Sequence, residues 1–323
     1  MANRKIEEKL EQLSLLRNVP KAEAISRLRK ALDDRANVVV AKAAKIGAEL
    51  EIQDLMPDMV RAFDRLLEKP VASDPQCWGK NALAIALRDL GYACAEPFVR
   101  GLRHIQMEPI WGGRSDTAQV LRAACCAALP QCSDITRDDV LRCLVDAFAD
   151  ESDKVRVDAA RSIAHMGGAD CALLLRLKAR IGDTESHVTG QVFDSLLRLE
   201  REAALAFVTE FLDSPDAEVS AEAALAMGSS RLAAALAILK AAWKRERKPV
   251  FLRGISASGL PEAFEFLLDL LQSDREIDAS QALDAFALHR DSPEIRKSVE
   301  QAILSKADSR LQSRFGQLFS AQG

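Results

Sequence analysis

The chain has 323 residues, of which 48% are apolar, 28% are charged and 5% are aromatic. This balance is rich enough to bury a core, and it excludes a collagen, a disulfide-rich miniprotein and a disordered chain. The formal net charge is only −4 and is spread evenly along the sequence, which argues against a dedicated nucleic-acid-binding protein.

The composition favours helices over strands. Glycine (15 residues) and proline (11 residues) are scarce and there is one tyrosine, whereas alanine and leucine are abundant. No apolar run approaches the roughly 18 residues of a membrane-spanning helix, and the first residues lack the apolar segment of a signal peptide. We therefore expect a cytoplasmic protein without a membrane partner.

A first set of segments, the A helices, is predicted from apolar residues at helical spacing, from prolines near the first turn and from polar loops. In chain order the predicted A helices are Lys21–Asp33, Gln53–Glu68, Glu96–Arg103, Arg137–Ala149, Ala169–Ile181, Glu202–Leu212, Arg231–Arg245, Pro261–Gln272 and Pro293–Lys306.

Between the A helices lie the B helices, each of which is aligned on one anchor position. The anchors are Val39, Trp78, Gln119, Val155, Val188, Val219, Val250 and Ile277, at spacings of 39, 41, 36, 33, 31, 31 and 27 residues. A period of this size that carries only helices predicts a helical solenoid. We expect an all-α fold of about eight to nine stacked hairpins, with 1–323 as a single domain and with caps at 1–34 and 292–323.

The residue four positions after each anchor shares the anchor's helix face. These residues are Ala43, Ala82, Ala123, Ala159, Val192, Ala223, Gly254 and Gln281, and all except Gln281 are small or β-branched. Small residues let neighbouring helices approach closely, so we predict that both columns are buried. Trp78 is accordingly expected in the core, and Ala159→Leu is expected to destabilise the fold.

Two copies of the B pattern are sharp, Asp153–Gly167 and Asp216–Gly228. In each, an acidic residue precedes apolar residues at helical spacing, and a glycine follows as the expected C-cap. The pattern resembles the HEAT repeat, especially the short HEAT-like form of phycobilin lyases. The resemblance implies a right-handed α-solenoid that binds macromolecules. It also implies that Arg156 pairs with loop acids, as the arginine of that family does.

A polar column follows three residues after each anchor. Its members are Lys42, Asn81, Arg122, Asp158, Gln191, Glu222, Arg253 and Ser280. We expect them on the exposed, concave side of the array. One interpretation is an ordinary solvated face. The other is a binding groove that is basic in its first half, through Lys42, Lys45, Lys80, Arg88 and Arg122, and acidic further along.

The two longest spacings flank the segments 69–77 and 104–116, which are therefore extended loops. In the second, Met107, Ile110 and Trp111 fit no helical period, and Gly112-Gly113 with Arg114 could hold an anion. The alternative is a loop whose tryptophan folds back onto the array. We predict a partner-binding site, and its residues are Lys42, Arg88, Trp111, Arg114, Arg122 and Asp158.

A second basic patch follows the seventh A helix. Its residues are Lys240, Trp243, Lys244, Arg245, Arg247 and Lys248. It could contact phosphate or an acidic partner, or it could be an ordinary basic helix C-terminus.

The seven cysteines and four histidines suggest no metal site, because they form no C-x-x-C pair and no short-range cluster. No catalytic motif is present either, so we assign no catalytic residue, metal or cofactor. The favoured hypothesis is a non-catalytic scaffold for another protein, and the basic half of the expected groove favours an acidic one. The alternatives are a nucleic-acid-binding protein, since some helical-repeat DNA glycosylases resemble this architecture, and a bilin lyase-like subunit.

Overall fold

The computed structural model describes residues 2–306 and 308–319. Helices dominate these residues, and the strands among them form one two-stranded hairpin. The chain divides into two compact units, Met1–Met166 and Gly167–Gly323. Among the described residues, no helix is both long and apolar enough to cross a membrane.

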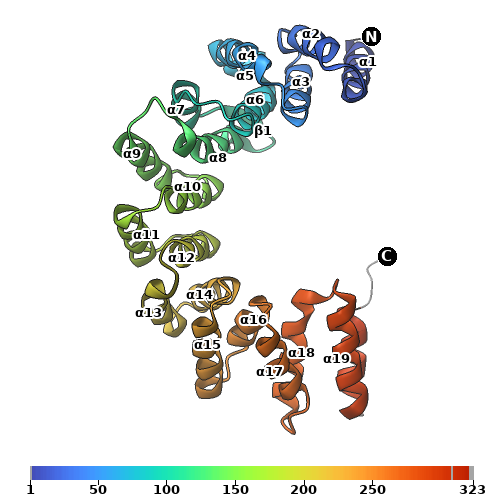
Figure 1. The fold of residues 1–323 in the computed structure, drawn as a ribbon, viewed down its shortest axis with the longest axis vertical. Helices are drawn as coiled ribbons and strands as arrows, with labels where there is room; N and C mark the ends of the chain where they lie inside the picture. The colour runs from blue at the N-terminus through green and yellow to red at the C-terminus, as the bar shows by residue number, and fades with distance from the viewer. Residues whose placement is uncertain (1, 307, 320–323) are drawn as a thin grey trace. The chain divides into compact units, whose positions relative to one another are not determined.

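The first unit alternates two layers of helices (Figure 1). Its elements are α1 (Ala2–Ser14), α2 (Lys21–Leu32), α3 (Asn37–Glu49), α4 (Met56–Glu68), α5 (Pro70–Ser73), α6 (Trp78–Asp89), α7 (Glu96–Leu102), β1 (Met107–Ile110), β2 (Gly113–Asp116), α8 (Gln119–Ala128), α9 (Arg137–Phe148) and α10 (Asp153–Met166). Helices α3, α6, α8 and α10 pack side by side, and each also packs against one helix of the set α2, α4, α7 and α9.

The second unit repeats this arrangement. Its helices are α11 (Ala169–Ile181), α12 (Ser186–Glu200), α13 (Leu205–Thr209), α14 (Ala217–Ser229), α15 (Ala233–Glu246), α16 (Pro249–Ala257), α17 (Pro261–Leu271), α18 (Glu276–Phe286), α19 (Pro293–Lys306) and α20 (Ser309–Phe319). Helices α12, α14, α16 and α18 pack in series, each beside the helix that precedes it. Short 3₁₀ turns in the two units lie at Leu15–Asn18, Gln53–Leu55, Pro75–Cys77, Leu129–Gln131, Arg201–Ala204, Glu210–Asp213 and Ala287–His289.

The helical part of the prediction is confirmed, and the packing is that of a helical repeat. The expected A helices correspond to α2, α4, α7 and α9 in the first unit and to α11, α13, α15, α17 and α19 in the second. Ala159 and Ala223 are fully buried, as the spacing of their helices predicts.

Three details of the predicted B helices are wrong. The anchor Ile277 is 58% exposed near the start of α18, so the anchor column is not buried there. Trp78 is 54% exposed, because α6 begins at this residue and buries Gly79 and Leu83 instead. Gly228 is not a C-cap: it lies inside α14 without a positive φ, whereas Gly167 ends α10 at φ +69°. Gly228 is required for packing, since a Cβ there would lie 1.9 Å from the carbonyl oxygen of Gly254.

The expectation of a purely α fold fails at 107–116. Strands β1 and β2 pair antiparallel, with Ile110 opposite Gly113, so that Trp111 and Gly112 form the turn. Gly112 has φ +85°, a conformation that favours glycine and that the third residue of a type II turn requires. Gly112-Gly113 therefore closes a hairpin between α7 and α8.

Candidate functional site

The hairpin and its surroundings concentrate exposed apolar side chains. Trp111 is 101% exposed at the tip, so it does not fold back onto the helices. Ile105, Met107 and Ile110 are exposed on the same segment, and Val71, Trp78 and Val120 are exposed nearby in the sequence. These are seven of the fifteen exposed large apolar side chains among the described residues, so nearly half of them fall within residues 71–120.

Glu108 anchors the hairpin from its buried face. Its side chain is almost fully buried, and its Oε1 accepts hydrogen bonds from the Gln76 backbone N–H (2.8 Å), Gln106 Nε2 (2.6 Å) and Thr117 Oγ1 (2.7 Å). Burial on its own raises the pKa of this carboxyl, but the three hydrogen bonds outweigh burial and lower the pKa below its ordinary value. Glu108 is therefore a structural anion.

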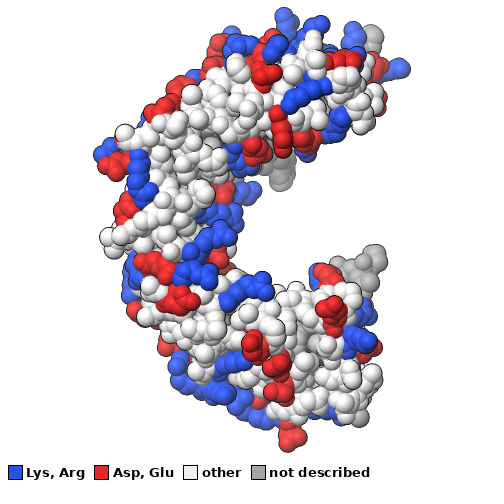
Figure 2. Space-filling model, viewed as in Figure 1, with Lys and Arg blue, Asp and Glu red and all other residues white. Residues whose placement is uncertain are grey.

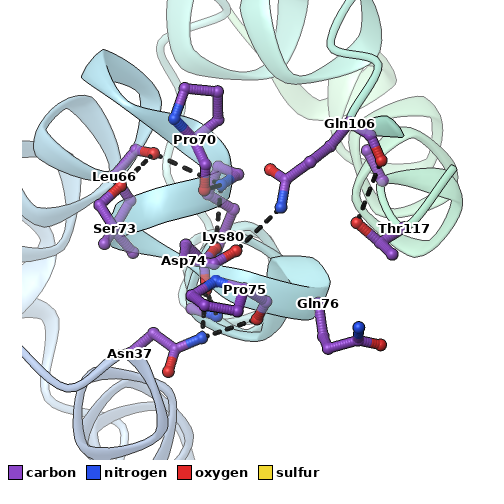
Figure 3. Close-up of polar contacts among 12 residues, drawn as sticks. Asn37, Leu66, Pro70, Ser73, Asp74, Pro75, Gln76, Lys80, Gln106 and Thr117 are labelled. Carbon is purple, nitrogen blue, oxygen red and sulfur yellow. Dashed lines mark hydrogen bonds and ion pairs between the residues drawn. The ribbon is translucent and has the colours of Figure 1, made fainter. Parts of the chain in front are cut away.

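A buried ion pair, formed by Asp74 and Lys80, lies next to Gln106 (Figure 3). Asp74 and Lys80 are both fully buried, and Lys80 Nζ lies 3.0 Å from Asp74 Oδ2. Asp74 Oδ1 accepts from the Gly79 N–H and from Asn37 Nδ2, both at 2.7 Å, and its Oδ2 accepts from the Lys80 N–H at 2.9 Å. Asp74 thereby caps α6 and ties α3 to it.

Gln106 joins this ion pair to the hairpin, since its Nε2 also donates to the carbonyl oxygen of Asp74 at 2.9 Å (Figure 3). The backbone between Asp74 and Trp78 is strained. Gln76 and Cys77 have φ values of +61° and +56°, which cost non-glycine residues about 1–3 kcal/mol each. The contacts of Asp74 and Glu108 hold this conformation, which places Trp78 on the surface.

Arg122 is buried, contrary to its predicted position on the exposed column. Its Nη1 donates to Asp116 Oδ2 (2.6 Å) and to the His104 carbonyl oxygen (3.1 Å), while its Nε and Nη2 bind Asp150 at 2.7 and 2.9 Å. Burial lowers the pKa of Arg122, but the two carboxylates raise it overall. Arg122 therefore fixes the hairpin to α8 and is not available to a partner. Lys80, predicted in the basic half of the column, is buried too.

Asp116 connects these contacts to the hairpin. Its Oδ1 accepts from the N–H groups of Gln106 and Ala118, both at 3.0 Å, so it both holds the hairpin base and caps α8. Burial raises the pKa of Asp116, but the hydrogen bonds and Arg122 lower it overall. We call the set Asn37, Asp74, Lys80, Gln106, Glu108, Asp116, Thr117, Arg122 and Asp150 the hairpin network.

The structure brings the predicted site residues together only in part. Trp111 and Arg114 share the hairpin, and Arg114 is exposed, with its Nη2 donating to the Met107 carbonyl oxygen at 2.8 Å. Arg88 pairs with Asp89, its chain neighbour. Two further members, Lys42 on α3 and Asp158 on α10, are half-buried, and Asp158 pairs with Arg161.

The second basic patch does not form the predicted surface. Trp243 is fully buried. Most of the cations are engaged: Lys240 donates to the Glu262 carbonyl oxygen, Arg245 pairs with Asp213 and Glu246, Arg247 with Asp278, and Lys248 with Glu246. Lys244 is exposed. The patch is thus the C-terminal end of α15 with its charges largely neutralised.

No disulfide joins any of the seven cysteines, all of which lie among the described residues, and five of them are buried. Burial raises the pKa of Cys77 to about 12, which keeps this thiol protonated and unreactive. Among the described residues, no three histidine, cysteine, aspartate or glutamate side chains gather in a way that could hold a metal ion.

Sequence reasoning missed most of the hairpin network. Asp74, Gln106, Glu108, Asp116 and Thr117 lie in or beside the two segments that lengthen the repeats, whereas Asn37 and Asp150 lie outside them. The sequence did hold a signal for the first five, because each insertion contains several polar residues beside apolar ones. An insertion this small has no core of its own, so polar contacts must hold it in place.

Comparison with known proteins finds no matching family model and no matching curated protein. The chain is similar to two crystal structures of engineered proteins. The first has 17% sequence identity, covers 97% of this chain and 93% of that chain, and has a TM-score of 0.38. The second has 16% sequence identity, covers 91% of this chain and 94% of that chain, and has a TM-score of 0.19. Neither likeness bears on the function of this chain.

Proposed function

We propose that the chain is a non-catalytic protein-binding scaffold whose hairpin docks a partner protein. The observation that carries the proposal is Trp111, which is fully exposed at the tip of a hairpin whose base is fixed by buried charges. Tryptophan is among the commonest binding hot spots, and a backbone that is already held in place loses little entropy when it binds. The hairpin therefore supplies a preorganised apolar anchor.

The proposal includes the finer description of the fold. The helix pairs are HEAT-like repeats, about eight to nine in number, in a right-handed solenoid. One observation supports the resemblance: Arg156, at the place of the family's arginine, donates from Nη1 to the carbonyl oxygens of Asp150 and Glu151 at 2.8 and 2.9 Å. The arginine thus secures the loop before its own helix.

The contacts favour a protein over a nucleic acid. Phosphate binding needs unengaged cations in a cluster. Arg122 and Arg88, two of the cations predicted to line the groove, are bound to carboxylates, and the lysines that remain lie on separate helices. On the face visible in Figure 2, groups of basic and of acidic side chains are separated by large uncharged areas. The exposed groups of the hairpin are instead an indole, aliphatic chains and one guanidinium, which suit an apolar pocket on a protein.

The test is a comparative capture from a native lysate of the source cells. Wild-type protein is the bait beside Trp111→Ala and a control, Leu177→Ala, which removes another exposed apolar side chain, on α11. We expect proteins that are retained by the wild type and by Leu177→Ala and lost with Trp111→Ala. Identical sets of captured proteins with all three baits would contradict the proposal.

A further inference from the structure

We infer that the partner presents a short apolar segment with acidic residues at both ends, and that this segment lies across the exposed faces of α6 and α8 beside the hairpin. The inference rests on the proposed function and specifies the partner's chemistry.

The exposed face of α8 carries no charge. Arg122 is the one charged residue of this helix, and it is buried in the hairpin network. What α8 exposes is Val120, with Gln119 and Ala127 half-exposed. A face that looked polar in the sequence is therefore mainly apolar in the structure.

Helix α6 continues this uncharged face, because it packs directly against α8. Trp78, Ala82 and Ile85 follow one another at helical spacing and are exposed or half-exposed. Lys80 is buried, and the remaining charges of α6, Arg88 and Asp89, pair with each other in its last turn. We call the exposed residues Trp78, Ala82, Ile85, Val120 and Ala127 the apolar strip.

Cations without an ion-pair partner among the described residues lie on both sides of the strip. Helix α3, next to α6, presents Lys42 and Lys45 from its exposed side. Helix α10, next to α8, presents Lys154 from its first turn, and the hairpin adds Arg114.

Helices α3 and α10 each carry one more basic than acidic side chain, with Asp153 included in the count. Glu49 on α3 pairs with Arg17, and Asp158 on α10 pairs with Arg161. The flanks of the strip therefore carry surplus positive charge, although the whole chain carries −4.

This pattern selects among possible ligands by charge complementarity. An apolar segment with aspartate or glutamate at its ends would bury the strip and place its carboxylates beside Lys42, Lys45 and Lys154. A basic segment would be repelled by the same lysines. A nucleic-acid strand would place regularly spaced phosphates over an uncharged centre that offers them no counter-charge.

The test uses a phage-displayed library of random 16-residue peptides, selected on the full-length wild-type protein and, in parallel, on Trp111→Ala. The selected peptides are then synthesised, each with a partner peptide in which aspartate and glutamate are replaced by lysine. Affinity is measured by fluorescence polarisation at low and high salt. The lysine variant is Lys42→Glu/Lys45→Glu, and its control, with the same change of charge, is Lys244→Glu/Lys297→Glu in the second unit.

We expect the wild type to enrich peptides with an apolar centre and acidic ends, and Trp111→Ala not to enrich them. Affinity should fall at least tenfold, about 1.4 kcal/mol, with Trp111→Ala, with Lys42→Glu/Lys45→Glu and with the lysine-substituted peptides. It should also fall at high salt and stay within about twofold with the control.

Two groups of outcomes overturn the inference, and they separate it from the proposed function. If Trp111 is needed for lysate capture but the selected peptides are basic or insensitive to the lysine variant, the partner class is wrong and the scaffold proposal stands. Trp111-dependent binding to phosphatidylserine vesicles or to a single-stranded DNA 30-mer, without acidic peptides, overturns both. Selection that is identical on wild type and Trp111→Ala, together with identical lysate capture, also overturns both.

Discussion

Neighbouring helices are held together by different means in the two units. In the second unit, α14 and α16 meet backbone to backbone: a Cβ on Gly254 would lie 2.4 Å from the Ala224 carbonyl oxygen. In the first unit, α6 packs against α8, and an inserted hairpin lies beside both helices. Buried charged side chains connect the three elements. The close contact of α14 and α16 leaves no room for an insertion, whereas the charged contact in the first unit holds a hairpin with an exposed apolar tip.

The difference follows from the length of the repeats. Anchors Val188, Val219 and Val250 are 31 residues apart, which leaves room for two helices and short turns. The spacings of 39 and 41 in the first unit add a segment too small to form its own core. A two-stranded hairpin is marginally stable by itself, so hydrogen bonds to the flanking helices must hold it.

The largest expected effect is the loss of the buried ion pair. Lys80→Met leaves the Asp74 carboxylate buried without its cation, and we expect a loss of about 3–5 kcal/mol in the free energy of unfolding. Urea unfolding measures this loss, and hydrogen exchange should show faster exchange at hairpin amides. A change below about 1 kcal/mol would mean that the ion pair is not what holds this region.

Next in size is the glycine contact of the second unit. Gly228→Ala forces a methyl group against the Gly254 backbone, and we expect a loss of about 1–3 kcal/mol. The matched control is Gly316→Ala, at a helical position where a Cβ meets nothing, which should gain up to about 1 kcal/mol. Equal unfolding midpoints for the two variants would contradict the close approach of α14 and α16.

Glu108 should make the first unit sensitive to acid. Its pKa is lowered in the folded state, so its stabilisation is present above the ordinary glutamate pKa of about 4.3 and is lost as pH falls through the folded value. Glu108→Gln should cost about 1–2 kcal/mol at pH 7. The difference between variant and wild type should shrink below pH 4. A cost that does not vary with pH would rule out the anionic role.

Glu222 in the second unit should behave in the opposite way. It is half-buried against Gly190, and burial raises its pKa. Because the pKa is raised in the folded state, this group contributes stability at pH values below the ordinary glutamate pKa. That contribution is lost as the pH rises through the pKa of the folded state. Glu222→Gln should therefore slightly raise the unfolding midpoint at pH 7, which a thermal melt measures. A lowered midpoint would show that the carboxylate has a stabilising partner.

The smallest expected effect on stability is that of Trp111→Ala. The indole is fully exposed, so its removal should change the free energy of unfolding by less than about 0.5 kcal/mol. A loss above 1 kcal/mol in urea unfolding would show that Trp111 packs against the protein.

Periodicity predicted the helices because helix boundaries follow local spacing, proline positions and loop residues. It predicted the buried alanines Ala159 and Ala223 for the same reason. It failed for Arg122. Helical spacing places this residue on the exposed face, but it cannot show that ion pairs with Asp116 and Asp150 keep the side chain buried. It also failed for the hairpin, whose anchors come from segments distant in sequence. The predicted and observed sites therefore differ where a side chain contacts residues that are distant in the sequence.

The central claim is that the hairpin presents Trp111 rigidly and fully exposed. Time-resolved fluorescence with iodide quenching tests both properties together in a Trp78→Phe/Trp243→Phe protein, in which Trp111 is the remaining tryptophan. The account predicts quenching close to that of free tryptophan amide and an anisotropy decay dominated by tumbling of the folded unit. Protection from iodide, or a dominant fast anisotropy decay, would contradict it.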